Sequence, residues 1–333
     1  MSAIKSFWSR IGKKGRISII VIFFLVIGGV GAILVRVPDP PHVVLPPEAL
    51  VSIGGEVEHG EAVGGFGITN TMVTAWISII ILGLIFYFGT RKMKLVPRGL
   101  QNFVEWLIEF MVNFVDSIAG EEKGRKFFPV VATIFLFVFA NAWLSLIPGY
   151  GTIGFKEVIH EGAEAKEIIL PILRGANTDV NVPLAIALIS FVFVEYWGLR
   201  FNGLNYLKKF ASFGTLGKSL GLIFRGKKAG FATLFNGVID VFIGFIEGLS
   251  ELIRVVSFTF RLFGNMTAGE ILLGSIMFLI PWVVADIFYG LELFIGVVQA
   301  LIFASLTLIF VTMATAPHEG HEENAGHAKH AEH

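Results

Sequence analysis

The stretch from Glu251 to Glu270 reads Glu-Leu-Ile-Arg-Val-Val-Ser-Phe-Thr-Phe-Arg-Leu-Phe-Gly-Asn-Met-Thr-Ala-Gly-Glu. It lies inside an otherwise apolar run over residues 234–280. Polar side chains recur there at steps of mostly three or four residues, which places them on one face of a helix. This stripe comprises Glu247, Ser250, Glu251, Arg254, Ser257, Arg261 and Asn265. Because a charge at mid-bilayer costs about 3 kcal/mol or more, such residues usually face protein or water and are functional candidates.

The rest of the chain is also built from apolar runs of membrane-spanning length. A spanning helix needs about 20 apolar residues. Six runs qualify, over residues 17–35, 71–90, 127–150, 181–199, 234–280 and 282–316. The composition agrees, since 54% of the 333 residues are hydrophobic, 16% are charged and the mean hydropathy is +0.75. The sequence therefore predicts an all-α polytopic membrane protein with about six transmembrane helices.

The fifth run is too long for an upright helix. Residues 234–280 would form a helix of about 70 Å, roughly twice the hydrocarbon thickness. We expect this helix to be strongly tilted and, with a turn at Pro281, to form a C-terminal hairpin with the sixth run. Eight of the nine ionisable residues other than His within the six runs lie on this hairpin, which makes it the expected functional region.

Basic residues alternate between the connecting segments. Residues 1–16, 91–126 and 200–228 carry five, seven and seven Lys or Arg, whereas residues 36–70 and 149–180 carry one and three. By the positive-inside rule the basic segments are cytoplasmic. Six crossings then place both termini in the cytoplasm and the acidic loops outside, with Asp39, Glu48, Glu56, Glu58, Glu61, Glu157, Glu161, Glu164 and Glu167.

Residues 99–119 predict an amphipathic helix on the cytoplasmic interface. Its apolar residues recur at helical spacing on the face opposite three acidic residues. The apolar residues are Phe103, Leu107, Phe110, Met111 and Phe114.

The first run has two interpretations, because a basic start before an apolar run also fits a secretory signal. We expect a retained anchor, since the run is long for a signal core and Val35-Arg36-Val37 does not resemble a cleavage site.

Several classes of function are excluded or disfavoured. The chain has no cysteine, which excludes disulfides and thiolate metal sites, and no phosphate-binding loop or H-E-x-x-H motif. Equal numbers of basic and acidic residues argue against a nucleic-acid partner. No histidine lies in a predicted span, which argues against an intramembrane hydrolase. We expect no cofactor, no metal and no enzymatic activity of the chain alone.

The core from Arg261 to Glu270, R-L-F-G-N-M-x-A-G-E, closely resembles the signature helix of subunit a of F-type ATP synthases. Residues 68–71, 173–181 and 290–303 resemble further blocks of that family in the same order, and the similarity extends over about residues 46–316. The resemblance implies an ion-translocating stator subunit that binds no nucleotide. It would form two half-channels against a ring of c subunits and couple proton flow to ring rotation and ATP synthesis.

The resemblance also implies partners and a segment order. Expected partners are the c-subunit ring, the peripheral-stalk b subunits, the remaining ATP synthase subunits and the lipid bilayer of a bacterial cytoplasmic membrane. We expect four segments: a basic start with an extra transmembrane anchor (1–38), an extracytoplasmic loop (39–70), the subunit a membrane domain (71–316) and a disordered, His- and Glu-rich cytoplasmic tail (317–333).

Individual roles follow from matching positions. Arg261 matches the essential stator cation facing the ring carboxylate, a role that suits a guanidinium because it stays protonated. The implied outer half-channel comprises Asn265, Glu270, Glu292, Gln299 and Asp179. Glu247, Ser250 and Glu251 are assigned to the inner half-channel by their position on the stripe. Many relatives have a histidine and a glutamate where this chain has Glu270 and Glu292, which puts in question any relay that needs an imidazole.

Other functions stay open at this point. A secondary transporter or an ion channel acting alone would also bury charges in its helices, although a transporter normally shows internal repeats and none is seen here. The coupling ion is expected to be the proton, but the ring carboxylate that decides between H⁺ and Na⁺ lies on another chain.

Overall fold

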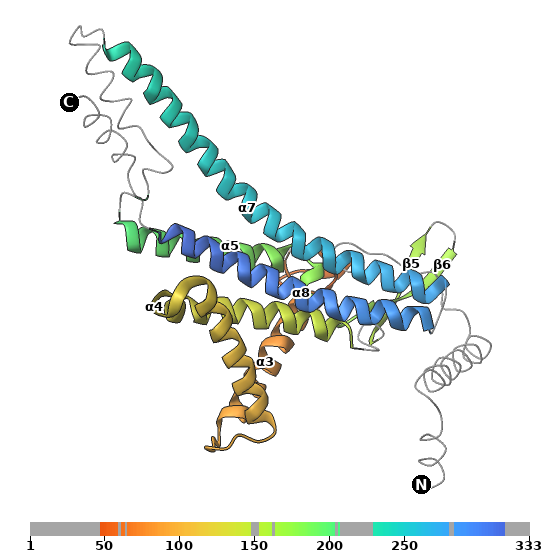
Figure 1. Ribbon diagram of the computed structural model, residues 1–333. Coiled ribbons are helices and arrows are strands. Elements are labelled where there is room, and N and C mark those ends of the chain that lie inside the picture. The colour runs from red at the N-terminus through yellow and green to blue at the C-terminus, as the bar shows by residue number, and fades with distance from the viewer. Residues whose placement is uncertain are drawn as a thin grey trace. The chain divides into compact units, whose positions relative to one another are not determined.

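The computed structural model describes residues 47–58, 61–63, 65–147, 153–161, 164–203, 206, 229–279 and 283–316. These residues form five α-helices (Figure 1): α3 (Asn70–Thr90), α4 (Leu100–Ser145), α5 (Asn181–Asn202), α7 (Ala229–Leu279) and α8 (Val283–Ala314). The prediction of a predominantly helical, polytopic membrane protein is confirmed. The predicted anchor over residues 17–35, the turn at Pro281 and the tail from residue 317 lie outside the described residues.

Four of these helices are long and apolar enough to cross a membrane, namely α3, α4, α5 and residues Val284–Ala314 of α8. The predicted long fifth helix is α7, which runs without interruption for 51 residues (Figure 1). At 1.5 Å per residue it is about 75 Å long. The charged stripe therefore lies on a single continuous helix.

Helix α4 consists of two arms joined at Gly120. This glycine has φ 74° and ψ 158°, a conformation open to glycine because it has no Cβ. The first arm is the predicted amphipathic helix. Its buried side is formed by Val104, Met111 and Val115.

The apolar face expected on this first arm is split in the structure. Phe103 and Phe110 are exposed and flank the ring of Trp106, with both centroid distances 6.2 Å. Only Met111 of the five predicted residues is buried. The apolar surface of the arm is wider than one stripe, because aromatic rings continue it on a second side.

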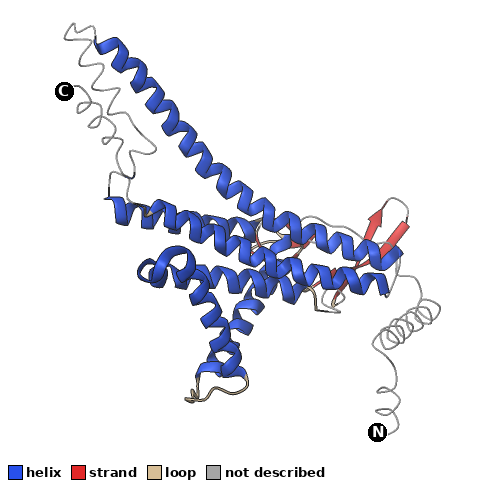
Figure 2. Ribbon diagram, in the orientation of Figure 1, coloured by secondary structure: helices blue, strands red, loops and turns tan. Residues whose placement is uncertain are grey.

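Within the described residues, three antiparallel strand pairs lie before α3 and between α4 and α5, and the sequence analysis missed them (Figure 2). Strand β1 (Ala49–Ile53) pairs with β4 (Phe66–Thr69), β2 (Glu56–Glu58) with β3 (Glu61–Val63), and β5 (Gly154–Glu161) with β6 (Glu164–Pro171). Strands of three to eight residues have no long apolar run, so a search for membrane-spanning helices passes over them.

The chain divides into two compact units. Unit 1 comprises Met1–Ile77, Phe139–Asp179 and Phe263–Val298, and unit 2 comprises Ser78–Val138, Val180–Leu262 and Gln299–His333. Helices α3, α4, α7 and α8 each contribute residues to both units. In unit 1 the indole of Trp143 donates a hydrogen bond to the Leu293 carbonyl (3.3 Å), which joins α4 to α8.

The core of unit 2 is built on one face of α8. Residues Ala300, Phe303, Ala304, Thr307, Leu308 and Val311 recur at helical spacing and are almost fully buried. Phe258 of α7 packs on Phe303 with ring centroids 4.8 Å apart. The Ser190 and Thr307 hydroxyls hydrogen-bond at 2.7 Å. Because lipid is as apolar as these side chains, such close packing and interhelical hydrogen bonds hold the helices together.

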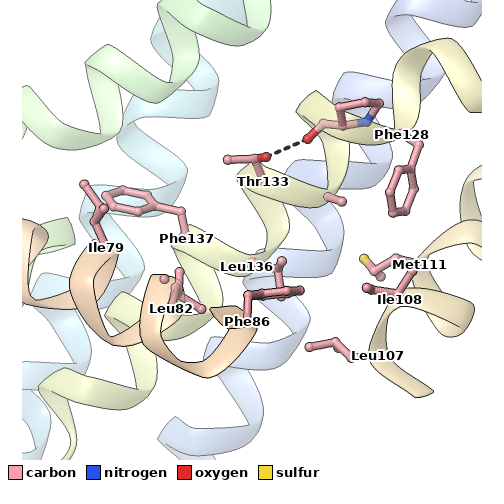
Figure 3. A pocket seen from close by; sticks show the side chains of 13 residues that line it. Ile79, Leu82, Phe86, Leu107, Ile108, Met111, Phe128, Thr133, Leu136 and Phe137 are labelled. Atoms are coloured by element: carbon pink, nitrogen blue, oxygen red, sulfur yellow. Dashed lines mark hydrogen bonds between the residues drawn. The ribbon is translucent and has the colours of Figure 1, made fainter. Parts of the chain in front are cut away.

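Unit 2 also contains an apolar cavity of about 430 Å³ between α3 and the two arms of α4 (Figure 3). Its lining includes Leu82, Phe86 and Met111 and carries no ionisable side chain. The Thr133 hydroxyl already donates to the Pro129 carbonyl at 2.6 Å. The cavity therefore lacks the groups needed for ion transfer.

Candidate functional site

Arg261 lies in the unit 2 part of α7 and is half-buried. Its guanidinium is 6.0 Å from the centre of the Phe258 ring, at the edge of a cation–π contact. Within the described residues no carboxylate forms an ion pair with it. A membrane-embedded arginine is costly unless water or a partner solvates it. The charge of Arg261 must therefore be offset by water or by a carboxylate outside the described residues.

An exposed apolar face runs along the same part of α7 up to Arg261. Its members recur every three or four residues and are large: Leu249, Leu252, Ile253, Val256 and Phe260. Such a face suits either lipid or packing against other transmembrane helices. The arginine therefore lies next to a surface on which apolar helices can pack.

Glu292 of α8 contacts α7 in unit 1. The Glu292 side chain is only 5% exposed. Its carboxylate lies against the backbone of Gly269, where an added Cβ would collide with all three carboxylate atoms. Only glycine leaves this space. The structure thereby brings Glu292 next to the residue that precedes Glu270 in the chain.

Glu270 is paired with a cation that the sequence analysis did not single out. Its carboxylate Oε1 is 3.4 Å from Nε of Arg174. Arg174 is buried, whereas the Glu270 side chain is 47% exposed. The two predicted glutamates therefore differ, because Glu270 has a cation partner and Glu292 is packed on a glycine. Arg174 lay within the family-like block at 173–181, which was the signal available.

Asp179 follows the short 3-10 helix η2 (Ala176–Thr178) and is buried. Its Oδ2 accepts a hydrogen bond from the Thr71 hydroxyl at 3.0 Å. The whole turn from Arg174 to Asp179 is buried in unit 1. This turn therefore carries both Arg174, the cation partner of Glu270, and the Asp179 carboxylate.

The remaining predicted outer residues are placed differently. Asn265 is exposed on the unit 1 part of α7. Gln299 is buried and belongs to the unit 2 part of α8. Four of the five outer residues therefore fall in unit 1.

The predicted inner residues all lie on the unit 2 part of α7. Glu251 is buried and forms a two-pronged ion pair with Arg254, with oxygen–nitrogen distances of 2.6 and 3.0 Å. The Arg254 guanidinium lies 3.8 Å from the centre of the Phe310 ring. Glu247 is half-buried and Ser250 is exposed. The structure thus gives Arg254 a partner within its own helix.

A buried tyrosine in unit 2 was also missed. Tyr206 is 1% exposed, and its ring occupies space that a Cβ at Gly198 would take. Its hydroxyl donates to Glu195 Oε1 at 3.4 Å. Burial raises the pKa of the Tyr206 hydroxyl above its usual value, and the charges of Glu195 and Glu251 raise it further. A single tyrosine in a connecting segment has no periodicity by which sequence could reveal it.

In the described part of the chain, no group of three or more His, Cys, Asp or Glu side chains could hold a metal ion. The chemistry that the arrangement offers is that of carboxylates, amides and one arginine without a described counter-ion. The carboxylates among these groups can accept and release protons.

Comparison with known proteins gives a consistent result. The family described as ATP synthase A chain matches residues 72–312. ATP synthase subunit a of Gloeobacter violaceus is 30% identical over 254 residues, which cover 76% of this chain and 86% of that protein. ATP synthase subunit a of Helicobacter pylori strain P12 is 29% identical over 259 residues, covering 77% of this chain and 95% of that protein.

Proposed function

The chain belongs to the ATP synthase A chain family, and from this membership we propose that it is the ion-translocating stator of a rotary F-type ATP synthase. It is an integral membrane protein and a non-catalytic subunit that assembles with other ATP synthase subunits. In the proposal, two half-channels face a ring of c subunits, and proton flow through them drives ring rotation and ATP synthesis.

The proposal gives Arg261 the central role. The observation that carries it is an arginine on a long helix, without a carboxylate partner in the described residues, beside an exposed apolar face. Ring helices would pack on that face and offer their carboxylates to the guanidinium. Because Arg261 keeps its own proton, it attracts an ionised ring carboxylate and bars direct proton passage from one half-channel to the other.

The outer half-channel in this proposal uses Asp179, Asn265, Glu270, Glu292 and Gln299. Arg174 offsets the charge of Glu270, whereas Glu292 has no cation partner among the described residues. We assign the last proton transfer to the ring to Glu292, since an ion-paired carboxylate is held in one protonation state more firmly. This division of roles removes the need for an imidazole at either position.

The inner half-channel is proposed at Glu247, Ser250 and Glu251. The half-buried Glu247 is the acid best suited to exchange protons there, because Glu251 is held by Arg254. Glu251 would then contribute a polar group to the inner half-channel and orient the side chains next to it.

We also propose that the chain resides in a bacterial cytoplasmic membrane with both termini inside, and that residues 1–38 anchor it.

The peripheral-stalk b subunits complete the proposed set of partners, together with the c-ring. The segments proposed from the sequence are an outer loop at 39–70, the channel-forming domain at 71–316 and a cytoplasmic tail at 317–333.

The test is Arg261→Ala in the whole ATP synthase, reconstituted in vesicles. We expect ATP-driven proton pumping to be abolished while the complex still assembles. The matched control is Arg200→Ala, which removes an exposed arginine at the end of α5 and should pump normally. Pumping by Arg261→Ala at the wild-type level contradicts the proposal. Solute uptake by the purified chain alone supports a secondary transporter instead.

A further inference from the structure

Glu48 is an outer-loop acid to which the proposed mechanism gives no role. It precedes β1 in unit 1, and its side chain is buried. Oε2 accepts a hydrogen bond from Nδ2 of Asn70 at 3.2 Å, and the Glu48 carbonyl accepts one from the Asn70 backbone N–H at 3.0 Å. A buried carboxyl is costly unless it is hydrogen-bonded. Glu48 is therefore an integrated part of the interior.

The first two residues of α3 connect Glu48 to the turn that carries Asp179. Asn70 is fully buried, and its Nδ2 also reaches the Pro171 carbonyl at 3.2 Å. Thr71, the next residue, donates to Asp179 at 3.0 Å. Two carboxyl groups are thus held by adjacent residues at the N-terminus of one helix, where the helix dipole favours negative charge.

The same part of unit 1 has buried amide atoms without a protein partner. Asn177 is 2% exposed, and neither its Oδ1 nor its Nδ2 has a hydrogen-bond partner within the described residues. Oδ1 of Asn70 is in the same situation. Each such group destabilises the fold if it stays unsatisfied. Buried polar groups of this kind are normally satisfied by ordered water.

We propose that the outer half-channel begins in a hydrated polar cluster in which Glu48 is a second proton-carrying carboxyl, ahead of Asp179. This cluster, the outer polar cluster, comprises Glu48, Asn70, Thr71, Asn177 and Asp179. A hydronium gives its proton to the Glu48 carboxylate. Water bound to the Asn70 and Asn177 amides then passes a proton to Asp179, and the Glu48 carboxylate is restored. No oxidant or second reactant is needed.

Further charged groups link the turn of Asp179 to α7. The buried turn of Asp179 also carries Arg174, and Arg174 is paired with Glu270 of α7. In this proposal, a proton that leaves Asp179 reaches the predicted outer-channel residue Glu270, whose cation partner Arg174 lies on the same turn as Asp179. The inference rests on the proposed function and lengthens its outer path.

A purely structural role for Glu48 makes a different prediction. Glu48 also holds the start of α3 through Asn70. Glu48→Gln keeps an oxygen that accepts the hydrogen bond from Asn70 but cannot carry a proton at neutral pH. A structural role would therefore survive this substitution, whereas a relay would not.

The first experiment measures proton flow through the whole complex in vesicles as the pH on the outer side is varied. Glu48→Gln is expected to slow proton uptake by roughly tenfold at alkaline outer pH and much less at acidic pH, where hydronium is abundant. The control is Glu56→Gln, the same change on strand β2. Equal flow in Glu48→Gln and wild type over the whole pH range overturns the inference.

The second experiment tests hydration directly and uses the absence of native cysteine from the chain. Asn177→Cys in the complex is expected to react with a small charged methanethiosulfonate reagent added outside, although the position is buried. Val51→Cys on exposed β1 is the reactive control, and Val131→Cys in the apolar interior is the unreactive one. Asn177→Cys as inert as Val131→Cys overturns the hydrated cluster.

The two proposals fail separately. If Arg261→Ala pumps normally, the proposed stator function is wrong whatever Glu48→Gln does. If Arg261→Ala is blocked while Glu48→Gln keeps the wild-type pH profile, the function stands and only the role of Glu48 falls.

Discussion

The two units of the chain handle charge in different ways. In unit 1 the polar groups come from several elements, and their contacts join distant parts of the sequence, as in Arg174 with Glu270 and Thr71 with Asp179. In unit 2 the buried ion pair of Glu251 and Arg254 is closed within one helix, three residues apart. The polar groups of unit 1 are therefore surrounded by several segments, as expected for the lining of an ion pathway. Unit 2 pairs Glu251 with Arg254 within one helix and leaves Arg261 without a carboxylate partner in the described residues.

The largest effect on stability is expected from breaking the ion pair of unit 2. Arg254→Ala leaves the buried Glu251 carboxylate without its partner, which costs about 3–5 kcal/mol. The double variant Glu251→Leu with Arg254→Leu removes both charges and should recover most of that loss. Thermal unfolding of the detergent-solubilised complex measures both. If the single and double variants unfold at the same temperature, the pair is not the local neutralising unit described here.

The next effect concerns the unequal glutamates of unit 1. Glu292→Gln is expected to reduce ATP-driven pumping by about tenfold, because the proposed last relay loses its exchangeable proton. The effect should be weaker than that of Arg261→Ala. Glu270→Gln, which removes the ion-paired partner of Arg174, is the comparison variant. A complete block by Glu292→Gln would mean that this residue does more than relay protons.

The sequence predicted the helices and the polar stripe because both depend on local pattern. The apolar run at 234–280 implied the single long helix α7, and the steps of three or four implied one polar face. The pairing of Glu251 with Arg254 has the same origin, since residues three apart on a helix are neighbours. The strands β1 to β6 were missed because short hairpins have no comparable run.

The contacts of unit 1 could not be predicted from the sequence, for a different reason. Glu48 and Asn70 are 22 residues apart, and Thr71 and Asp179 are 108 apart. Periodicity within one helix cannot indicate which distant turn will face it. Family-like blocks pointed to Asp179 and Glu292 but not to Glu48, which precedes those blocks. Tertiary packing alone supplied the partner of each carboxyl.

A smaller effect on pumping is expected from a substitution that displaces the Glu292 side chain but leaves the residue itself unchanged. Gly269→Ala places a Cβ where the Glu292 carboxylate lies, so the flexible end of that side chain must shift. We expect about a threefold loss of pumping, because proton transfer depends on position. Gly264→Ala is the matched control on the same helix, since a Cβ there meets no atom within 4 Å. Equal activity of the two variants would mean that the contact with Gly269 is not needed.

The smallest effect is expected from Tyr206→Phe in unit 2. At neutral pH the variant loses the hydrogen bond to Glu195, which is worth about 1 kcal/mol. The pH dependence carries more information. The pKa of Tyr206 is raised in the folded protein, so its neutral form contributes stability that is fully present below the unfolded value of about 10. That contribution is lost as the pH rises towards the folded value.

Thermal unfolding of the complex at pH 8 and pH 10.5 tests this expectation. Wild type should lose more stability than Tyr206→Phe over this interval, because the phenylalanine has no proton to release. Tyr87→Phe, at an exposed position on α3, controls for the loss of a hydroxyl and should follow the wild type. Parallel curves for Tyr206→Phe and wild type would mean that the Tyr206 hydroxyl is not buried against Glu195. The local charge handling of unit 2 would then be confined to α7.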